Sequence, residues 1–282
     1  MFNLKESKIA IIGLGLMGGS MALALKGHCS SLVGIDPDSA ALSLALRQNI
    51  VDLADSDPAK LLPLADLVIL AAPVPAILTL LEHLPAYTPN PLLVLDLGST
   101  KRAIVEKMEQ LPERFDPIGG HPICGKEKLT IANAERTLYY AAPFILTPLA
   151  RTTPRAQSAA DQILAVLGAN RILIDPADHD RILASTSHLP FLLSSALCLA
   201  TPGEATPLIG PGFRSTSRLA GTPSSMMMGV LQTNRQNILA AIHCLQAELT
   251  TLETALTAED FPIIQSTLDT AREKYTRITS NQ

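Results

Sequence analysis

A glycine-rich turn near the N-terminus has the spacing of a dinucleotide-binding site. Residues 13–18 read Gly-Leu-Gly-Leu-Met-Gly and follow directly after an apolar, β-branched run. Gly13 allows a tight turn, Gly15 lets a pyrophosphate approach the main chain, and Gly18 lets the following helix pack closely on the strand. We expect the phosphates to lie at the positive end of that helix, against the free N–H groups around Leu16 and Met17.

An acidic residue further along the chain indicates which dinucleotide binds. Asp36 ends the next predicted strand. Its carboxylate can accept hydrogen bonds from both ribose hydroxyls of NAD and would repel the 2′-phosphate of NADP. The next cation, Arg47, lies too far along the following helix to bind that phosphate. The sequence therefore predicts NAD as the cofactor, with Asp38 as the alternative ribose ligand should the strand end two residues later.

The elements that position these residues alternate between strand and helix. Apolar runs without alternating polarity indicate strands buried on both faces, as in a parallel sheet covered by helices. Ligands bind beyond the carboxyl ends of such strands, so Ala72, Pro73 and Ser99 are expected to line the cofactor crevice. The predicted strands span residues 8–12, 31–35, 67–72, 92–96, 144–146 and 171–174, and helices are predicted over 17–26, 38–48, from about 101, and over 156–167.

The second part of the chain has a different pattern. Residues 178–200 and 226–255 are rich in leucine and alanine and have helical periodicity, with no convincing strand. We predict an α/β Rossmann domain with a mainly parallel sheet over residues 1–177, followed by an all-α domain over residues 178–282. Helices this apolar favour burial against a second copy of the chain, so a homodimer formed through the helical domain is expected.

Composition limits the partners and the compartment. The 282 residues are 47% hydrophobic and 17% charged, enough for a large core, and the net charge of −4 argues against a nucleic-acid-binding protein. The four cysteines are singly spaced, which indicates reduced thiols in a cytoplasmic protein and neither disulfides nor a metal site. The apolar stretches 9–25 and 61–81 are interrupted by glycines or by aspartate and prolines, so we expect no signal peptide and no membrane span.

Four further motifs follow the glycine turn in a fixed order. They are Asp-Leu-Gly-Ser-Thr-Lys at 96–101, Gly-Gly-His-Pro-Ile-Cys-Gly at 119–125, Ser-His-Leu-Pro at 187–190 and Gly-Phe-Arg-Ser-Thr-Ser-Arg at 212–218. With these motifs the sequence, from about residue 8 to residue 237, resembles the prephenate/arogenate dehydrogenase family. The resemblance implies NAD-dependent oxidative decarboxylation of prephenate to 4-hydroxyphenylpyruvate, or of arogenate to tyrosine, in aromatic amino-acid biosynthesis.

The resemblance also implies roles for individual residues. His121, in a glycine-rich loop, would accept the proton of the substrate hydroxyl, and a histidine near its ordinary pKa suits that task at neutral pH. Ser99 would hydrogen-bond near the hydroxyl, the imidazole and the nicotinamide. His188, in the first long helix of the second domain, would position the substrate. Arg214 would bind the ring carboxylate in a bidentate manner, and Arg218 is a second anion contact or part of a structural ion pair.

Each of these side chains also has a structural interpretation. His121 is alternatively a turn histidine, His188 a core histidine, Arg214 a member of a surface ion pair, and Ser99 a cap for the following helix. The pair His179–Asp180 resembles a helix start capped by Asp178, and we assign it no chemistry.

Three positions depart from the family pattern and bear on substrate preference. Ser215 replaces an acid that commonly follows the arginine, Phe191 stands where a second histidine is frequent, and a tryptophan common near residues 226–228 is absent. Glu127 is a candidate partner for the ammonium group of arogenate.

Two other functions are compatible with parts of this pattern. A different dehydrogenase with a Rossmann domain and helices, acting on 3-hydroxy acids or imines, would usually carry a catalytic lysine in the long helix that here offers His188. A non-catalytic, NAD-sensing dimer would have no need of His121, Ser99 and Arg214 together.

Overall fold

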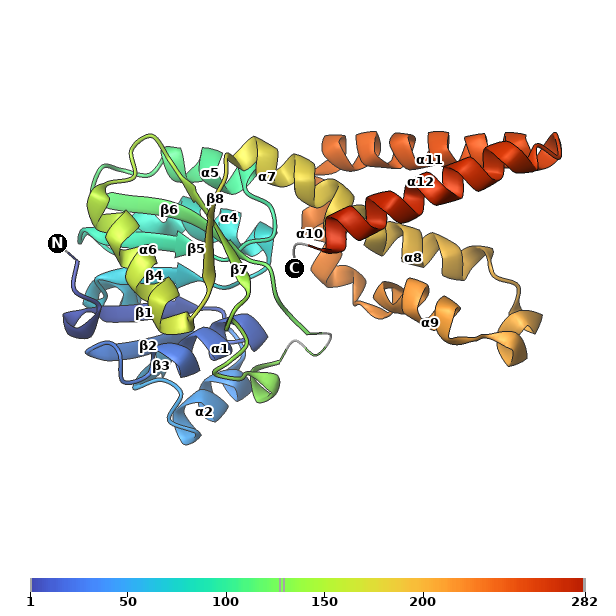
Figure 1. The fold of residues 1–282 in the computed structure, drawn as a ribbon. Coiled ribbons are helices and arrows are strands. Elements are labelled where there is room, and N and C mark those ends of the chain that lie inside the picture. The colour runs from blue at the N-terminus through green and yellow to red at the C-terminus, as the bar shows by residue number, and fades with distance from the viewer. Residues whose placement is uncertain (1, 127, 129, 281–282) are drawn as a thin grey trace. The chain divides into compact units, whose positions relative to one another are not determined.

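The computed structural model describes residues 2–126, 128 and 130–280, and its central element is an eight-stranded sheet (Figure 1). The strand order is β3-β2-β1-β4-β5-β6-β7-β8, and every neighbouring pair is parallel except β6 with β7. The strands are β1 (Lys8–Ile12), β2 (Ser31–Ile35), β3 (Leu53–Asp55), β4 (Leu67–Leu70), β5 (Leu92–Asp96), β6 (Phe115–Pro122), β7 (Pro143–Pro148) and β8 (Asn170–Leu173).

Helices cover both faces of this sheet, which explains why its central strands β1, β4 and β5 are apolar on both sides. Successive side chains of a strand point to opposite faces, and those of β1 belong alternately to two separate cores. One core is formed with α1 (Leu16–Leu25) and α6 (Pro154–Leu167), and the other with α4 (Val74–Tyr87) and α5 (Arg102–Glu109). The predicted Rossmann architecture with a mainly parallel sheet is confirmed.

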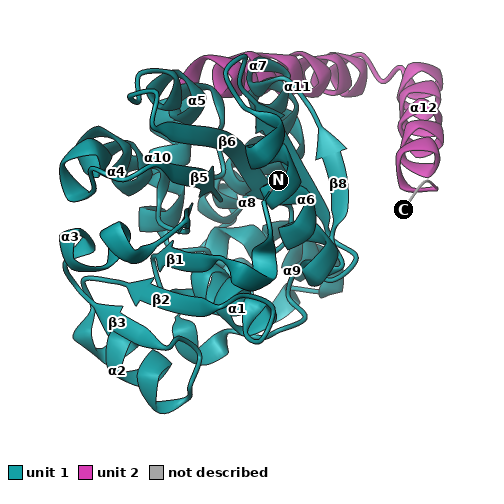
Figure 2. Cartoon of the chain, turned by 90° about the vertical axis from the view of Figure 1, so that its left-hand side faces the viewer, with its two compact units in different colours: residues 1–234 teal, residues 235–282 magenta. Residues whose placement is uncertain are grey.

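The described chain after β8 is helical. It continues with α7 (Pro176–Leu183), a π-helical turn (Ala184–His188), α8 (Leu189–Ala200), α9 (Pro211–Ser217) and α10 (Ser224–Thr233), with short 3-10 turns between some of them. Residues 1–234 form one compact unit and residues 235–282 another, which contains α11 (Arg235–Thr257) and α12 (Phe261–Thr279) (Figure 2). The domain boundary near residue 177 remains a prediction, because the two compact units divide the chain at residue 234 and do not test a boundary within the first unit.

Several elements differ from the sequence prediction, among them two strands and one long helix. The short strand β3 and the whole of β6 were not predicted, and the helix expected over 226–255 is two helices separated at Asn234. The Asn234 side chain bonds to the Asp180 carbonyl oxygen and to His188, which belong to earlier helical segments.

Two apolar stretches have a membrane-like length. Residues 61–81 include the end of the short helix α3 (Pro58–Leu61), β4 and part of α4, as expected from the interrupted pattern. The helical run Pro176–Ala200 is, by length and composition, long and apolar enough to cross a membrane, and 22% of its most apolar window is buried.

Candidate active site

The glycine turn has the geometry that its sequence predicts. Gly13 has a φ of 97°, and a Cβ atom there would lie 2.4 Å from the carbonyl oxygen of Ala71. A Cβ at Gly18 would lie 1.8 Å from the Gly13 carbonyl oxygen. Gly15 directly precedes α1, and no side chain caps that helix, so the N–H groups of its first turn face a potential phosphate.

The Asp36 side chain is hydrogen-bonded to the glycine turn. It follows β2 directly, and its carboxylate accepts hydrogen bonds from the Leu14 N–H at 2.6 Å and the Asp38 N–H at 2.8 Å. Asp38 itself caps α2 (Ser39–Arg47) by accepting from the Ala40 N–H at 2.8 Å. Asp36 is thus the carboxylate held against the glycine turn, while Asp38 serves the helix start.

The remaining predicted residues of the crevice follow the carboxyl ends of neighbouring strands. Ala72 and Pro73 follow β4, Ser99 follows β5, and His121 lies at the end of β6. Because β1, β2, β4, β5 and β6 are parallel, these ends share one edge of the sheet with Gly13 and Asp36. The half-buried Ser99 side chain does not cap α5, so its alternative interpretation as a helix cap is wrong.

His121 lies in a strand and not in the glycine-rich loop that we predicted. It pairs with Ile145 of β7 in the antiparallel part of the sheet. The glycines before it allow close approach: a Cβ at Gly119 would lie 2.1 Å from Thr147 Oγ1, and one at Gly120 would lie 2.7 Å from the Asp96 carbonyl oxygen. The imidazole is therefore carried by the rigid sheet.

A buried ion pair supports this end of β6 from behind. Lys101 and Asp96 are fully buried and bond to each other through Nζ and Oδ2. Lys101 Nζ also donates to the Gly120 carbonyl at 2.6 Å, and Asp96 Oδ1 accepts from the Gly120 N–H at 3.0 Å. Burial lowers the pKa of Lys101, and the Asp96 carboxylate opposes that shift. The pair connects the end of β5 with the backbone immediately before His121.

The His121 imidazole is bonded to a second histidine that we had assigned no chemistry. Its Nδ1 lies 2.8 Å from His179 Nε2, and His179 Nδ1 lies 2.7 Å from Asp180 Oδ1. Both partners are buried residues of α7. Burial, followed by the nearby His179, Lys101 and His188, holds the pKa of His121 well below its ordinary value. The ring is therefore neutral at pH 7, as a general base must be.

His188 ends the π-helical turn between α7 and α8. Pro190 follows in the first turn of α8 and has no N–H to donate, which explains a local widening of the helix here. His188 is 2% exposed, and its Nδ1 lies 3.1 Å from Asn234 Nδ2. Burial lowers the pKa of His188 to about 4, with Asp180 opposing the shift.

The two arginines lie on different elements from the histidines. Arg214 is exposed on α9, and its guanidinium makes no hydrogen bond or ion pair with any residue of the described ranges. Arg218 begins the 3-10 turn Arg218–Gly221. The structure thus groups His121 with His188 through bonded neighbours and does not join Arg214 to that group.

Sequence reasoning missed five residues around the two histidines: Asp96, Lys101, His179, Asp180 and Asn234. The predicted cap of α7 was also wrong, since Asp175, and not Asp178, accepts from the Ala177 N–H. The only sequence signal for His179–Asp180 was two adjacent polar residues at the start of an apolar helix. Within the described ranges no three His, Cys, Asp or Glu side chains converge as metal ligands.

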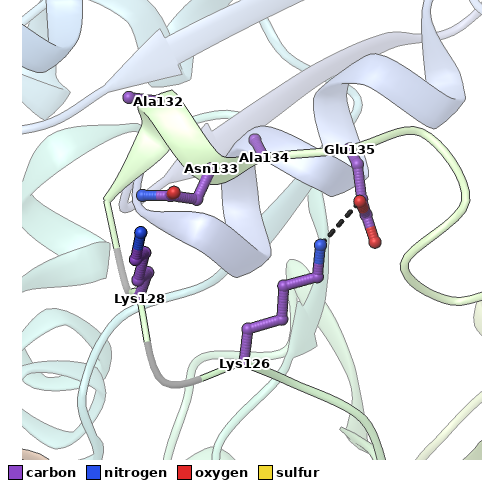
Figure 3. Close-up of a pocket in the computed structure, with 6 residues that line it drawn as sticks. All are labelled: Lys126, Lys128, Ala132, Asn133, Ala134 and Glu135. Atoms are coloured by element: carbon purple, nitrogen blue, oxygen red, sulfur yellow. Dashed lines mark ion pairs between the residues drawn. The ribbon is translucent and has the colours of Figure 1, made fainter.

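The segment after β6 packs on the glycine-turn helix and carries a surface pocket. A Cβ at Gly19 of α1 would lie 2.9 Å from Ala134, and the Glu135 N–H donates to Ser20 Oγ at 3.0 Å. Figure 3 shows the pocket, with Lys126 paired to Glu135 at 2.6 Å and Lys128 next to Asn133 on the other side. The pocket shares no residue with the histidine group. Glu127, our candidate for the ammonium of arogenate, lies outside the described residues.

Comparison with known proteins identifies the family. Residues 21–173 match "Prephenate dehydrogenase, nucleotide-binding domain", and residues 175–270 match "Prephenate dehydrogenase, dimerization domain". Prephenate dehydrogenase of Bacillus subtilis is 32% identical over 269 residues, which cover 92% of this chain and 72% of the relative. The chain belongs to the prephenate dehydrogenase family. It is a dehydrogenase, and the alternative of a different Rossmann dehydrogenase is set aside.

Solved structures of this dehydrogenase family have the same fold. Arogenate dehydrogenase of Synechocystis is 31% identical with a TM-score of 0.83, covering 96% of this chain and 100% of the other. Prephenate dehydrogenase of A. aeolicus, solved in complex with hydroxyphenyl propionate and NAD+, is 27% identical with a TM-score of 0.90, covering 98% of this chain and 100% of the other. One relative thus carries the name of the prephenate enzyme and the other that of the arogenate enzyme.

Proposed function

We propose that this dehydrogenase oxidises and decarboxylates prephenate or arogenate with NAD, in the synthesis of tyrosine. The residues fit the cofactor: the positive φ of Gly13 and the close contacts at Gly13 and Gly18 leave room for backbone only, and α1 has no capping side chain. Asp36, held against that turn, would accept the ribose hydroxyls and disfavour a 2′-phosphate. When bound, NAD supplies the hydride acceptor.

The observation that carries the reaction is the buried imidazole of His121, fixed through its Nδ1 at the carboxyl edge of the sheet. Its Nδ1 is bonded to His179, so Nε2 is the nitrogen available to a substrate. We propose that Nε2 accepts the proton of the ring hydroxyl as hydride leaves the same carbon, after which CO2 departs and the ring becomes aromatic. General-base assistance of this kind is worth about 10²–10⁴-fold. Ser99, on the neighbouring strand end, would orient the hydroxyl.

The direct test supplies NAD with prephenate and with arogenate in separate reactions and follows NADH absorbance. We expect turnover of at least one substrate, and NADP in place of NAD should support much less. Absence of NADH formation with both substrates, from protein that binds NAD, would contradict the proposed function. The same assay decides between the two substrates, which the changes at Phe191 and Ser215 leave open.

We propose that Arg214 binds a substrate carboxylate through its guanidinium, which pairs with no side chain in the part of the chain that the structure describes. Arg214→Gln removes a charge-assisted bidentate contact, so we expect KM for the substrate to rise by about 10- to 100-fold with a smaller change in kcat. The control is Arg155→Gln, which removes an exposed arginine from α6. Steady-state kinetics at saturating NAD measure both variants. An unaltered KM in Arg214→Gln would show that Arg214 does not bind the substrate.

The depressed pKa of His121 predicts the pH dependence of the reaction. The sign follows from burial: a buried imidazolium is disfavoured, so the inactive protonated ring forms only at more acidic pH than for an ordinary histidine with pKa 6.5. As pH falls through that value, kcat/KM should stay on its plateau, and it should decline only further into acid. A pH profile of kcat/KM with the preferred substrate checks this, and an acid limb at or above pH 6.5 would contradict it.

We propose that the protein acts as a homodimer in the cytoplasm, with no nucleic-acid or membrane partner. Its C-terminal region matches a family domain described as a dimerization domain. Large apolar side chains remain exposed on the helices of residues 235–282, among them Leu249, Leu256, Phe261 and Leu268. A second copy of the chain would cover such surfaces. Sedimentation of the full chain measures the mass, and a strict monomer would contradict the dimer.

A further inference from the structure

Asp180 makes more contacts with the candidate site than any role in a helix start requires. Its carboxylate accepts from His179 Nδ1 at 2.7 Å, from the Lys101 N–H at 2.7 Å and from the Arg102 N–H at 3.0 Å. Its backbone carbonyl accepts from Asn234 Nδ2 at 2.7 Å. The residue is 1% exposed. Because the two backbone donors open α5, Asp180 both caps that helix and is fixed in place by it.

The Asp180 carboxylate determines which ring nitrogens of His179 and His121 carry a proton. An ionised carboxylate only accepts hydrogen bonds, so His179 Nδ1 carries its proton toward Asp180. A neutral His179 then has a bare Nε2, which must accept from the group 2.8 Å away, His121 Nδ1. His121 therefore carries its proton on Nδ1 and presents an unprotonated Nε2.

The backbone carbonyl determines the proton position on the other histidine. Asn234 Nδ2 must be the amide nitrogen, because it faces a carbonyl oxygen that can only accept. The second hydrogen of this amide nitrogen points to His188 Nδ1 at 3.1 Å, which therefore accepts. Neutral His188 consequently carries its proton on Nε2 and presents a donor.

We infer that Asp180 is a positioning residue that fixes opposite tautomers on the two histidines of the site, an acceptor at His121 Nε2 and a donor at His188 Nε2. The inference rests on the proposed function for its meaning: such a substrate has one hydroxyl that must lose a proton, and carboxylate groups that need donors. The charged and titratable groups that face His121 are His179, Lys101 and His188. Among them only His179 bonds to the His121 ring. The tautomer of His121 therefore depends on the chain of hydrogen bonds that runs from Asp180 through His179 to His121.

The first test reads the tautomers without any substrate. Nitrogen NMR of the labelled imidazoles in the intact chain distinguishes protonated from bare ring nitrogens. We expect His121 to be protonated on Nδ1 and His188 on Nε2. The opposite tautomer on His121 would overturn the inference even if the protein turns over prephenate or arogenate, and the expected tautomers in an inactive protein would overturn the proposed function alone.

The second test alters His179, the middle residue of this chain of hydrogen bonds, and measures catalysis. His179→Gln keeps an amide N–H for Asp180 and an amide oxygen for His121, whereas His179→Leu has a similar volume and neither group. We expect the leucine variant to lose about 10²–10⁴-fold in kcat, the effect known for loss of a tautomer-fixing partner, and the glutamine variant to recover at least about tenfold of that loss. NAD affinity should be unaltered in both.

Asp180→Asn changes the carboxylate at which this chain of hydrogen bonds begins. Its matched control is Asp178→Asn, two residues away on the exposed side of α7. We expect a comparable loss of kcat in Asp180→Asn, an acid limb of kcat/KM at a different pH from that of the parent, and no change in Asp178→Asn. Because Asp180 also caps α5, thermal unfolding is recorded for each variant. Equal kcat and equal pH profiles in the parent, His179→Gln and His179→Leu would overturn the inference irrespective of how Asp180→Asn folds.

Discussion

Replacing His121 by asparagine is expected to lower kcat by about 10²–10⁴-fold, the usual contribution of a general base, while leaving NAD affinity unaltered. Asparagine is close to histidine in size and can still donate to His179, so the end of β6 should keep its structure. It has no lone pair basic enough to accept a hydroxyl proton as hydride leaves. Steady-state kinetics with the preferred substrate and a separate NAD-binding titration measure the two effects.

The matched control is His83→Asn, which replaces an exposed histidine of α4. This variant should behave as the parent does. Equal kcat in His121→Asn and the parent would remove His121 from the mechanism and leave the nucleotide-binding site unaffected.

Replacing Lys101 by methionine is expected to lower the free energy of unfolding by about 3–5 kcal/mol, the cost of leaving one member of a buried ion pair without its partner. The variant keeps the aliphatic volume but leaves the fully buried Asp96 carboxylate facing no cation. It also removes the donor to the Gly120 carbonyl, immediately before His121. Loss of stability and loss of activity should therefore occur together.

Denaturant unfolding of the full chain measures the first of these effects. Lys60→Met is the control, because Lys60 forms an ion pair with Asp55 on the surface, where solvent screens the charges. We expect no measurable change in the control. Equal unfolding midpoints for Lys101→Met and the parent would mean that the buried pair does not stabilise this end of the sheet.

Much of the Rossmann half could be predicted from sequence because its signals are local. The strands β1, β2 and β5 were predicted with their observed bounds, since each is a short, mostly apolar run next to a glycine or a polar residue. The glycine spacing also located the turn at Gly13, where the positive φ leaves no alternative to glycine. These features depend on neighbours in the chain, which a single sequence displays.

The features that were missed depend on contacts between distant segments. The strand β6 contains Pro117, Gly119, Gly120 and Pro122, residues that weaken a strand, and it forms because β5 and β7 pair with it on either side. The bond from His121 to His179 joins residues 58 positions apart, and the bond from Lys101 to Asp180 joins residues 79 apart. No local pattern distinguishes such a pair from an ordinary polar helix start.

The central proposal is that His121 Nε2 receives the proton of the substrate hydroxyl beside the nicotinamide. A crystal structure of the full chain with NAD and 4-hydroxyphenylpyruvate tests it most directly. We expect Nε2 within about 2.6–3.2 Å of the ring hydroxyl, with the nicotinamide against the carbon that bears this hydroxyl. An imidazole remote from that hydroxyl, or one that presents Nδ1 to it after releasing His179, would contradict the account.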